Sequence, residues 1–156
     1  MPELPEVEVV KRSLEKKIQN LIIKKVKISD GNLRYKVSKV ETSRLIGRKI
    51  KKIARRSKFL IFEFDQDKLM LVHLGMTGKF FFINKNKKKF KTSFYYNLDI
   101  KKDSKYDRVI FVFKDNQKLI YNDMRKFGFI KFLDIKKYRE NLHIKNLGPE
   151  PLKKKI

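Results

Sequence analysis

The spacing of apolar residues along the chain changes from a helical to a strand period near residue 21. Before that point apolar side chains recur every three or four positions, as one buried face of a helix requires: Val7, Val10, Leu14, Ile18 and Leu21. Pro5 suits a first helical turn, and glutamates at the start with lysines at the end match the helix dipole. The first part of the chain therefore predicts an amphipathic helix.

The rest of the chain is dominated by short runs of β-branched and aromatic residues, which predict strands. These runs cover residues 21–29, 49–53, 58–65, 68–74, 79–83, 108–114, 118–122 and 127–133. Polar triplets at 65–67 and 115–117 are typical of hairpin turns, and a second short helix is predicted around 135–143. The fold class is therefore mainly β with flanking helices. A sandwich or a barrel fits this pattern, and we expect an antiparallel two-sheet β-sandwich with an N-terminal helix and a short C-terminal helix.

Charge narrows the class of partner. The 156 residues include 41 Lys and Arg against 17 Asp and Glu, a net charge of +24, which favours a polyanion such as nucleic acid. A genome rich in A and T would also enrich Lys, Ile, Asn and Phe, so charge alone leaves both explanations open. Without cysteine, the chain has no disulfide, thiolate nucleophile or Cys-ligated zinc. It also has no signal peptide and no apolar run long enough for a membrane span, so we expect a cytoplasmic, nucleoid-associated protein.

Two segments depart from the strand pattern. Residues 84–91 form a basic run that is either a solvated loop or a phosphate-contacting arm, and we favour the solvated loop. Residues 147–156 contain Gly148, Pro149 and Pro151, a composition typical of linkers. We therefore expect a domain over 1–146, followed by a truncated linker over 147–156 after which a further segment once followed.

The N-terminus carries candidate chemistry. Removal of Met1 would leave Pro2 with a free secondary amine that titrates near ~8, so part of it is neutral and nucleophilic at physiological pH. Attack on a sugar C1′ would give an iminium that acidifies the C2′–H, so base loss and strand cleavage follow from one intermediate. Glu3 stands beside it as a general acid. Alone, the same residues also fit an ordinary Met-Pro start and a helix-start carboxylate.

Six blocks in order carry a family resemblance: residues 1–8 (MPELPEVE), 30–38, 55–64, 73–78, 121–128 and 147–152. The chain resembles the formamidopyrimidine-DNA glycosylase/endonuclease VIII family, in its formamidopyrimidine branch. The resemblance implies base-excision repair by a bifunctional DNA glycosylase/AP lyase. Its substrates would be oxidised purines such as 8-oxoguanine and formamidopyrimidine, attacked through an N-terminal proline Schiff base. The implied partner is damaged double-stranded DNA, bound by a monomer.

The resemblance also implies roles near the reacting sugar. Pro2 would be the Schiff-base nucleophile, Glu3 the adjacent acid and Glu6 a supporting carboxylate. Lys58 would contact phosphate and act in the elimination steps, although basic residues at a strand edge are commonly just solvated. His73 would hydrogen-bond a backbone phosphate, whereas the sequence alone favours a core histidine.

Three further positions would fill the space left when the damaged base is flipped out. Met76 lies between Gly75 and Gly78, which predicts an exposed turn rather than a core position. By the resemblance, Arg125 would face the orphaned cytosine and Phe127 would wedge beside it.

The chain also departs from the family pattern. Tyr106 stands where the family carries a DNA-contacting His, and Met124 stands where Pro is common. Family members continue into a helix–two-turns–helix domain and a four-Cys zinc finger, so we expect no cofactor in this chain. We expect activity impaired by truncation, with three alternatives: a non-catalytic basic DNA-binding fragment, a degenerate gene product, or one half of a split gene that needs a separate C-terminal half.

Overall fold

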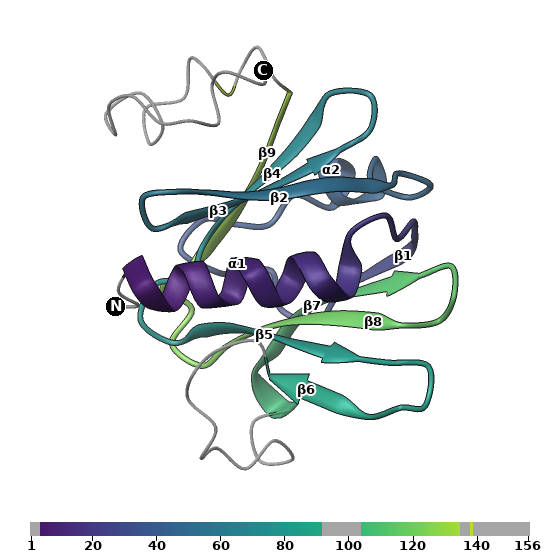
Figure 1. Ribbon diagram of the computed structural model, residues 1–156. Coiled ribbons are helices and arrows are strands. Elements are labelled where there is room, and N and C mark those ends of the chain that lie inside the picture. The colour runs from purple at the N-terminus through teal and green to yellow at the C-terminus, as the bar shows by residue number, and fades with distance from the viewer. Residues whose placement is uncertain (1–3, 92–103, 135–137, 139–156) are drawn as a thin grey trace.

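Two antiparallel sheets pack face to face, and one helix runs along the side of the sandwich (Figure 1). The computed structural model describes residues 4–91, 104–134 and 138. The first sheet has the strand order β1 (Ile23–Ile28), β7 (Asp107–Phe113), β8 (Lys118–Asp123), β5 (Gly78–Ile83) and β6 (Lys89–Lys91). The second has the order β2 (Ile50–Arg56), β3 (Phe59–Phe64), β4 (Lys68–His73) and β9 (Phe129–Asp134). The predicted two-sheet sandwich is confirmed.

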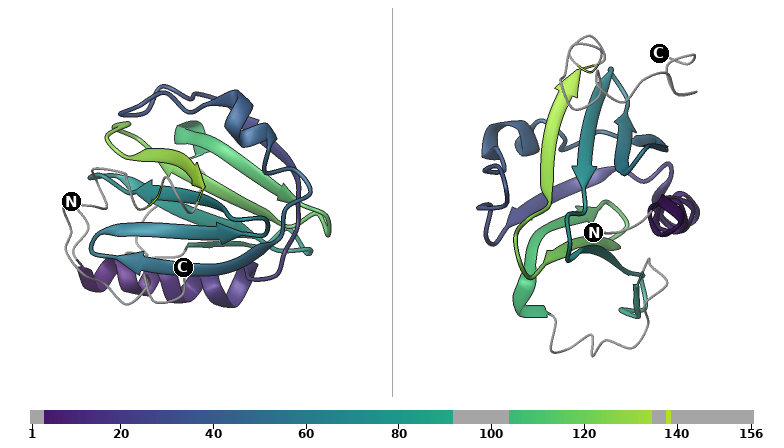
Figure 2. Two further views of the ribbon diagram at one scale, coloured as in Figure 1. Left: turned by 90° about the horizontal axis from the view of Figure 1, so that it is seen from above. Right: turned by 90° about the vertical axis from the view of Figure 1, so that its left-hand side faces the viewer.

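The helix α1 (Leu4–Ile18) forms where the apolar period predicted it. Val7, Val10, Leu14 and Ile18 are buried, while Leu21 lies beyond the helix end and is partly buried. Seen from above, α1 lies alongside the sandwich (Figure 2, left). Its apolar face therefore closes one side of the core between the sheets.

The predicted hairpin turns are present. Gln66 and Asp67 between β3 and β4 adopt φ values of 58° and 61°, and Asn116 between β7 and β8 adopts 71°. Side chains such as Asn and Asp tolerate this left-handed conformation because they bond their own backbone. In the second turn the carboxylate of Asp115 accepts from the N–H of Gln117 at 3.0 Å.

Two elements were missed. The basic segment predicted as a solvated loop is a turn only over 84–88, and it continues into β6, where Phe82 pairs with Phe90. Phe90 packs on the core, and its ring centre lies 4.3 Å from the Lys17 ammonium. The surrounding lysines made this strand look like a solvated loop, although one aromatic ring attaches it to the core.

The short helix α2 (Lys39–Ser43) begins at Ser38, whose hydroxyl accepts from the N–H of Glu41. The 3₁₀ turn η1 (Ser104–Tyr106) precedes β7.

The second sheet is apolar on both faces. Leu60, Phe62 and Phe64 of β3 join the core between the sheets, whereas Phe59 and Ile61 join a second cluster on the opposite face. This double burial accounts for the continuous apolar runs in β3 and β4. Tyr138 packs in the second cluster; the rest of the predicted helix 135–143 and the predicted linker 147–156 lie outside the described residues. Within the described part of the chain, no helix is both long and apolar enough to cross a membrane.

Candidate functional site

Segments that carry predicted site residues meet at one end of the sandwich. The sheet register pairs Phe59 with His73, and His73 with Phe129. The turn before β3, the loop after β4 and the loop before β9 therefore lie at the same end of the strands of the second sheet. In Figure 1 this is the left-hand end, where α1 also begins, and it faces the viewer in the right panel of Figure 2.

Two loops at this end present exposed side chains. Met76, on the loop 74–77, is 51% exposed; Met124 and Phe127, on the loop 124–128, are 47% and 45% exposed. Arg125 is also exposed, and its guanidinium carbon lies 5.1 Å from the centre of the Phe127 ring. The predicted exposed turn at Met76 is confirmed. Exposed apolar side chains gathered in this way are typical of a surface that contacts a partner.

The loop 124–128 is built around one buried carboxylate. Asp123, at the end of β8, has no exposed surface. Its Oδ1 accepts from the Thr77 hydroxyl at 2.6 Å and the Lys126 N–H at 3.1 Å. Its Oδ2 accepts from the Tyr121 hydroxyl at 2.8 Å and the Gly128 N–H at 2.9 Å. A buried charge requires such partners, and bonds to an ionised acceptor are the strong ones, so the loop is held on both sides of Arg125.

The two loops are joined to each other. The Thr77 Oγ1 that donates to Asp123 also accepts from the N–H of Arg125 at 2.9 Å. Gly75, with φ 62°, sits so close that a Cβ there would lie 2.6 Å from the backbone nitrogen of Gly128. Because the backbones touch and a hydroxyl bridges them, Met76 and the Arg125 loop keep one relative position.

A second layer supports the loop from behind. Arg108, only 8% exposed, donates from Nε to the carbonyl of Asp123 at 2.9 Å and from its terminal nitrogen to the carbonyl of Met124 at 3.3 Å. Asp30 contacts both Arg108, at 3.4 Å, and the Lys126 ammonium, at 2.5 Å. The Lys126 bond is the main reason that the pKa of Asp30 lies below its ordinary value.

Tyr106 lies next to this layer. It is half-buried in η1, and the guanidinium carbon of Arg108 is 5.6 Å from the centre of its ring. A phenol side chain has no cationic form, so this position contributes a hydrogen-bonding group rather than a cation.

His73 is held in a defined orientation. It is 8% exposed, stacks on Phe129 with ring centres 5.5 Å apart, and meets Phe59 edge-on. Its Nδ1 accepts from the N–H of Gly75 at 3.0 Å. An accepting Nδ1 carries no proton, which assigns the neutral imidazole with its proton on Nε2. The ring thus combines a packed environment with one donor nitrogen.

Lys58 lies in the turn between β2 and β3, and that turn is tied to α1. Glu8 accepts from Arg55 Nε at 2.7 Å, and Arg55 also donates to the carbonyl of Ser57 at 3.1 Å. Ser57 adopts φ 53°, so the turn is sharp next to the half-buried Lys58. The bond from Arg55 is the main reason that the pKa of Glu8 is lowered. The sequence showed Glu8 only as a helix-start charge, since its partner lies 47 residues away.

The N-terminal candidates are only partly described. Pro2 and Glu3 lie outside the described residues, and Glu6 lies half-buried in the first turn of α1. The structure therefore brings together Lys58, His73, Met76, Arg125 and Phe127, with Tyr106 behind the loop 124–128.

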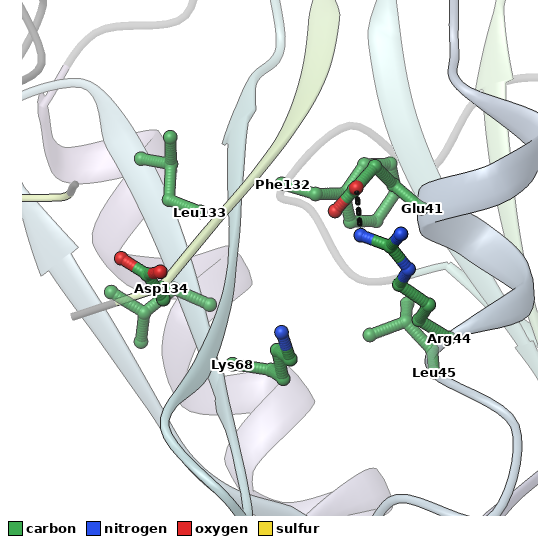
Figure 3. A pocket seen from close by; sticks show the side chains of 8 residues that line it. Glu41, Arg44, Leu45, Lys68, Phe132, Leu133 and Asp134 are labelled. Atoms are coloured by element: carbon green, nitrogen blue, oxygen red, sulfur yellow. Dashed lines mark hydrogen bonds and ion pairs between the residues drawn. The ribbon is translucent and has the colours of Figure 1, made fainter. Parts of the chain in front are cut away.

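The described residues hold no metal cluster, and the pocket at the far end of the second sheet is small. The described residues contain no group of three or more His, Cys, Asp or Glu that would hold a metal, and a chain without cysteine supplies no ligand for a four-Cys zinc site. A pocket of about 120 Å³ lies at the opposite end of the second sheet, between Lys68, Asp134 and α2 (Figure 3). Its Arg44 is paired with Glu41 at 2.7 Å, and its volume is below the roughly 300 Å³ of typical ligand sites.

Comparison with known proteins points to one family. A family model described as the formamidopyrimidine-DNA glycosylase N-terminal domain matches residues 1–130. Formamidopyrimidine-DNA glycosylase of Rickettsia bellii (strain OSU 85-389) is 40% identical over 152 residues, covering 97% of this chain and 50% of the relative. The corresponding protein of Wolbachia pipientis subsp. Culex pipiens is 38% identical over 152 residues, with coverage of 97% and 50%.

Solved structures give the same result. A complex between Lactococcus lactis Fpg and DNA containing an abasic site superposes with a TM-score of 0.74 at 30% identity, covering 96% of this chain and 51% of that chain. A complex between an inhibited Fpg and DNA containing N7-benzyl-Fapy-dG reaches 0.76 at 31% identity, with coverage of 96% and 50%. The chain thus spans about half the length of the relatives that it matches.

Proposed function

The chain belongs to the formamidopyrimidine-DNA glycosylase family, and we propose that it acts on damaged double-stranded DNA in base-excision repair. The reaction is that of a bifunctional DNA glycosylase and AP lyase on oxidised purines such as 8-oxoguanine and formamidopyrimidine. The names of the relatives and the DNA in the neighbouring structures support this assignment.

The proposed chemistry begins at Pro2 after removal of Met1. The proline nitrogen forms a bond to C1′, and the damaged base leaves with the electrons of the glycosidic bond and a proton supplied through Glu3. The proline nitrogen loses its proton, its lone pair expels O4′ from C1′, and O4′ takes up a proton, so the sugar opens and an iminium forms. The iminium acidifies the C2′–H, a base removes that proton, and the 3′ phosphate leaves from C3′. Water then hydrolyses the iminium and frees the proline. Lys58 neutralises phosphate charge during elimination, and Glu6 supports the helix start.

One observation carries the proposal. The exposed side chains of Met76, Arg125 and Phe127 lie on two loops that are hydrogen-bonded to each other, at the end of the sandwich where α1 begins. Flipping a base out of a duplex costs a few kcal/mol of stacking and pairing. Apolar side chains that enter the vacated space recover part of this cost, and the Arg125 guanidinium can hydrogen-bond the unpaired base. Exposed apolar side chains beside the start of α1 are what this reaction needs.

Two further residues are assigned to the phosphate backbone. His73 donates from Nε2, the nitrogen that carries its proton. Tyr106 donates a weaker, uncharged bond where relatives are expected to use histidine. The net charge of +24 supplies a general attraction for DNA.

The 156-residue chain is expected to cleave abasic DNA better than it excises 8-oxoguanine. An abasic sugar opens to an aldehyde and has no base to flip and hold, so unstacking costs less, and the local site with its wedge residues is sufficient. Holding a flipped base takes more contacts, and this chain matches only half of each full-length relative.

The test is borohydride trapping of the chain on duplex DNA with one abasic site. The proposal expects a covalent adduct that is strongly reduced in Pro2→Gly, and intact mass spectrometry should show that adduct-forming protein lacks Met1. Binding without an adduct would favour the non-catalytic DNA-binding fragment, which the charge alone supports. An adduct undiminished in Pro2→Gly would assign the chemistry to lysines. Neither binding nor adduct would favour a degenerate gene product.

A further inference from the structure

We propose that the hydroxyl of Thr77 is a positioning group that couples the two exposed loops, so that Met76, Arg125 and Phe127 enter DNA as one rigid unit. The inference rests on the proposed function, because it concerns how the chain would open a duplex. Thr77 is half-buried behind the exposed side chains, so it acts through its neighbours rather than on the substrate.

The Thr77 hydroxyl donates one hydrogen bond and accepts another. It donates its proton to Asp123 at 2.6 Å and accepts from the N–H of Arg125 at 2.9 Å. A hydroxyl has one donor and two acceptor positions, so only Thr or Ser makes both bonds at this place. The loop 74–77 is thereby attached to the backbone of the residue that carries the Arg125 side chain.

The other end of this connection is immobile. Asp123 is fully buried and accepts three further bonds, from Tyr121, Lys126 and Gly128. Burial, with the Asp123 carboxylate beside it, raises the pKa of the Tyr121 hydroxyl well above its ordinary value of 10, so Tyr121 remains a donor. The carboxylate therefore keeps its orientation and transmits it to Thr77.

The backbone contact between the two loops limits how closely they approach each other but does not hold them together. Gly75 packs against the backbone of Phe127 and Gly128, and van der Waals contact of this kind limits how close the loops come. Within the described residues, the side-chain hydrogen bonds that join 74–77 to 123–128 are those of Thr77. Without them the loops are joined only through the flanking strand pairs His73–Phe129 and Gly78–Asp123 and the Gly75 contact, so their tips can separate more easily.

Spreading matters only when side chains push against stacked bases. Inserting apolar groups costs a few kcal/mol of unstacking per step. If the loops move apart during insertion, part of the binding free energy is lost to this displacement and does not contribute to unstacking. Preorganised loops avoid that loss. The Thr77 bridge should thus affect duplex DNA, while single-stranded DNA, which has no stack to open, should be indifferent to it.

The experiment compares Thr77→Val, which removes the hydroxyl at nearly constant shape, with Thr77→Ser, which keeps it. Each variant is trapped with borohydride on an abasic site in a duplex and in the same strand alone. A 2-aminopurine base beside the abasic site reports unstacking by fluorescence. Thr42→Val is the matched control, since buried Thr42 also donates through its hydroxyl, but to the carbonyl of Lys39 in α2.

We expect Thr77→Val to lower the duplex trapping rate about tenfold, the scale of two lost hydrogen bonds, and to lower the fluorescence change. Its single-strand rate should stay within about twofold of the unmodified chain, and Thr77→Ser and Thr42→Val should keep the duplex-to-single-strand ratio. Thr77→Ala removes the same group if the valine variant does not fold.

Two results would overturn the inference: an unchanged duplex rate and fluorescence, or an equal loss on duplex and single strand, which would mean general destabilisation. An unmodified chain that forms no adduct on either substrate refutes the proposed function instead. The fluorescence measurement then still decides whether Thr77 controls insertion.

Discussion

Gly128 occupies a place where even a methyl group has no room. A Cβ built there would lie 2.0 Å from the hydroxyl oxygen of Tyr121, 2.6 Å from the carbonyl oxygen of His73 and 2.9 Å from Oδ2 of Asp123. Gly128 is not among the described glycines with positive φ, so backbone strain does not enter. Gly128→Ala therefore tests packing around the buried carboxylate alone.

The expected cost has two parts. Forcing a methyl group into a filled core costs about 1–3 kcal/mol. Tyr121 is fully buried, with its ring centre 5.4 Å from that of Phe80, so its ring cannot retreat and the Tyr121–Asp123 bond must lengthen or break. A buried acceptor deprived of a donor adds about 1–3 kcal/mol. Gly128→Ala should thus lower the free energy of unfolding by about 2–5 kcal/mol.

Urea denaturation of the two proteins measures this difference. Gly47→Ala is the control, because Gly47 has φ 86° but no atom within 4 Å of its added Cβ, and it should cost only about 1–2 kcal/mol of left-handed strain. Tyr121→Phe removes the atom nearest the new methyl group. In the double variant the two costs should fall short of additivity by about 1 kcal/mol or more.

The reasoning is refuted if Gly128→Ala costs no more than Gly47→Ala, or if the Tyr121 and Gly128 effects add. In either case the loop before β9 would be yielding rather than tightly packed. The same loop would then be a poor support for Arg125 and Phe127.

Lys58→Ala should slow strand cleavage more than adduct formation, because the lysine is assigned to the elimination steps; gel assays of both rates would contradict this if they fell equally. Binding to undamaged duplex should weaken steeply with salt, since phosphate neutralisation releases counterions; a flat dependence in fluorescence anisotropy would exclude it. Glu8→Gln should destabilise the fold by about 1 kcal/mol at neutral pH. Because the folded pKa of Glu8 lies below its ordinary 4.5, that stabilisation is present above this pH and disappears as the pH falls through the folded pKa. Urea titrations from about pH 7 to about pH 3 that stay parallel would oppose this assignment.

The periodicities predicted most of the fold because they report burial directly. The buried face of α1 and the apolar runs of the strands were placed correctly, and the polar triplets 65–67 and 115–117 became turns. β6 was missed because lysines flank Phe90, the partly buried aromatic residue that packs it on the core. α2 was missed because five residues are too few to establish a period.

The candidate site was predicted unevenly. Flanking glycines correctly indicated that Met76 is exposed, and the motif around Arg125 placed Phe127 on an exposed loop. The same reasoning gave Asp123 and Thr77 no role, because nothing local distinguishes a buried carboxylate from a surface one. His73 is packed as the sequence alone favoured, and still keeps one donor nitrogen.

The sequence by itself determined most of the elements, the faces that they bury, the large positive charge and the family motifs. These follow from local spacing and residue type, which are readable along one dimension. Tertiary structure alone decided that Thr77 meets Asp123 across 46 residues and that Glu8 ties α1 to the turn beside Lys58 across 47. Hydrogen bonds reach only about 3 Å, so such partners are chosen by strand register and sheet packing rather than by neighbours in the chain.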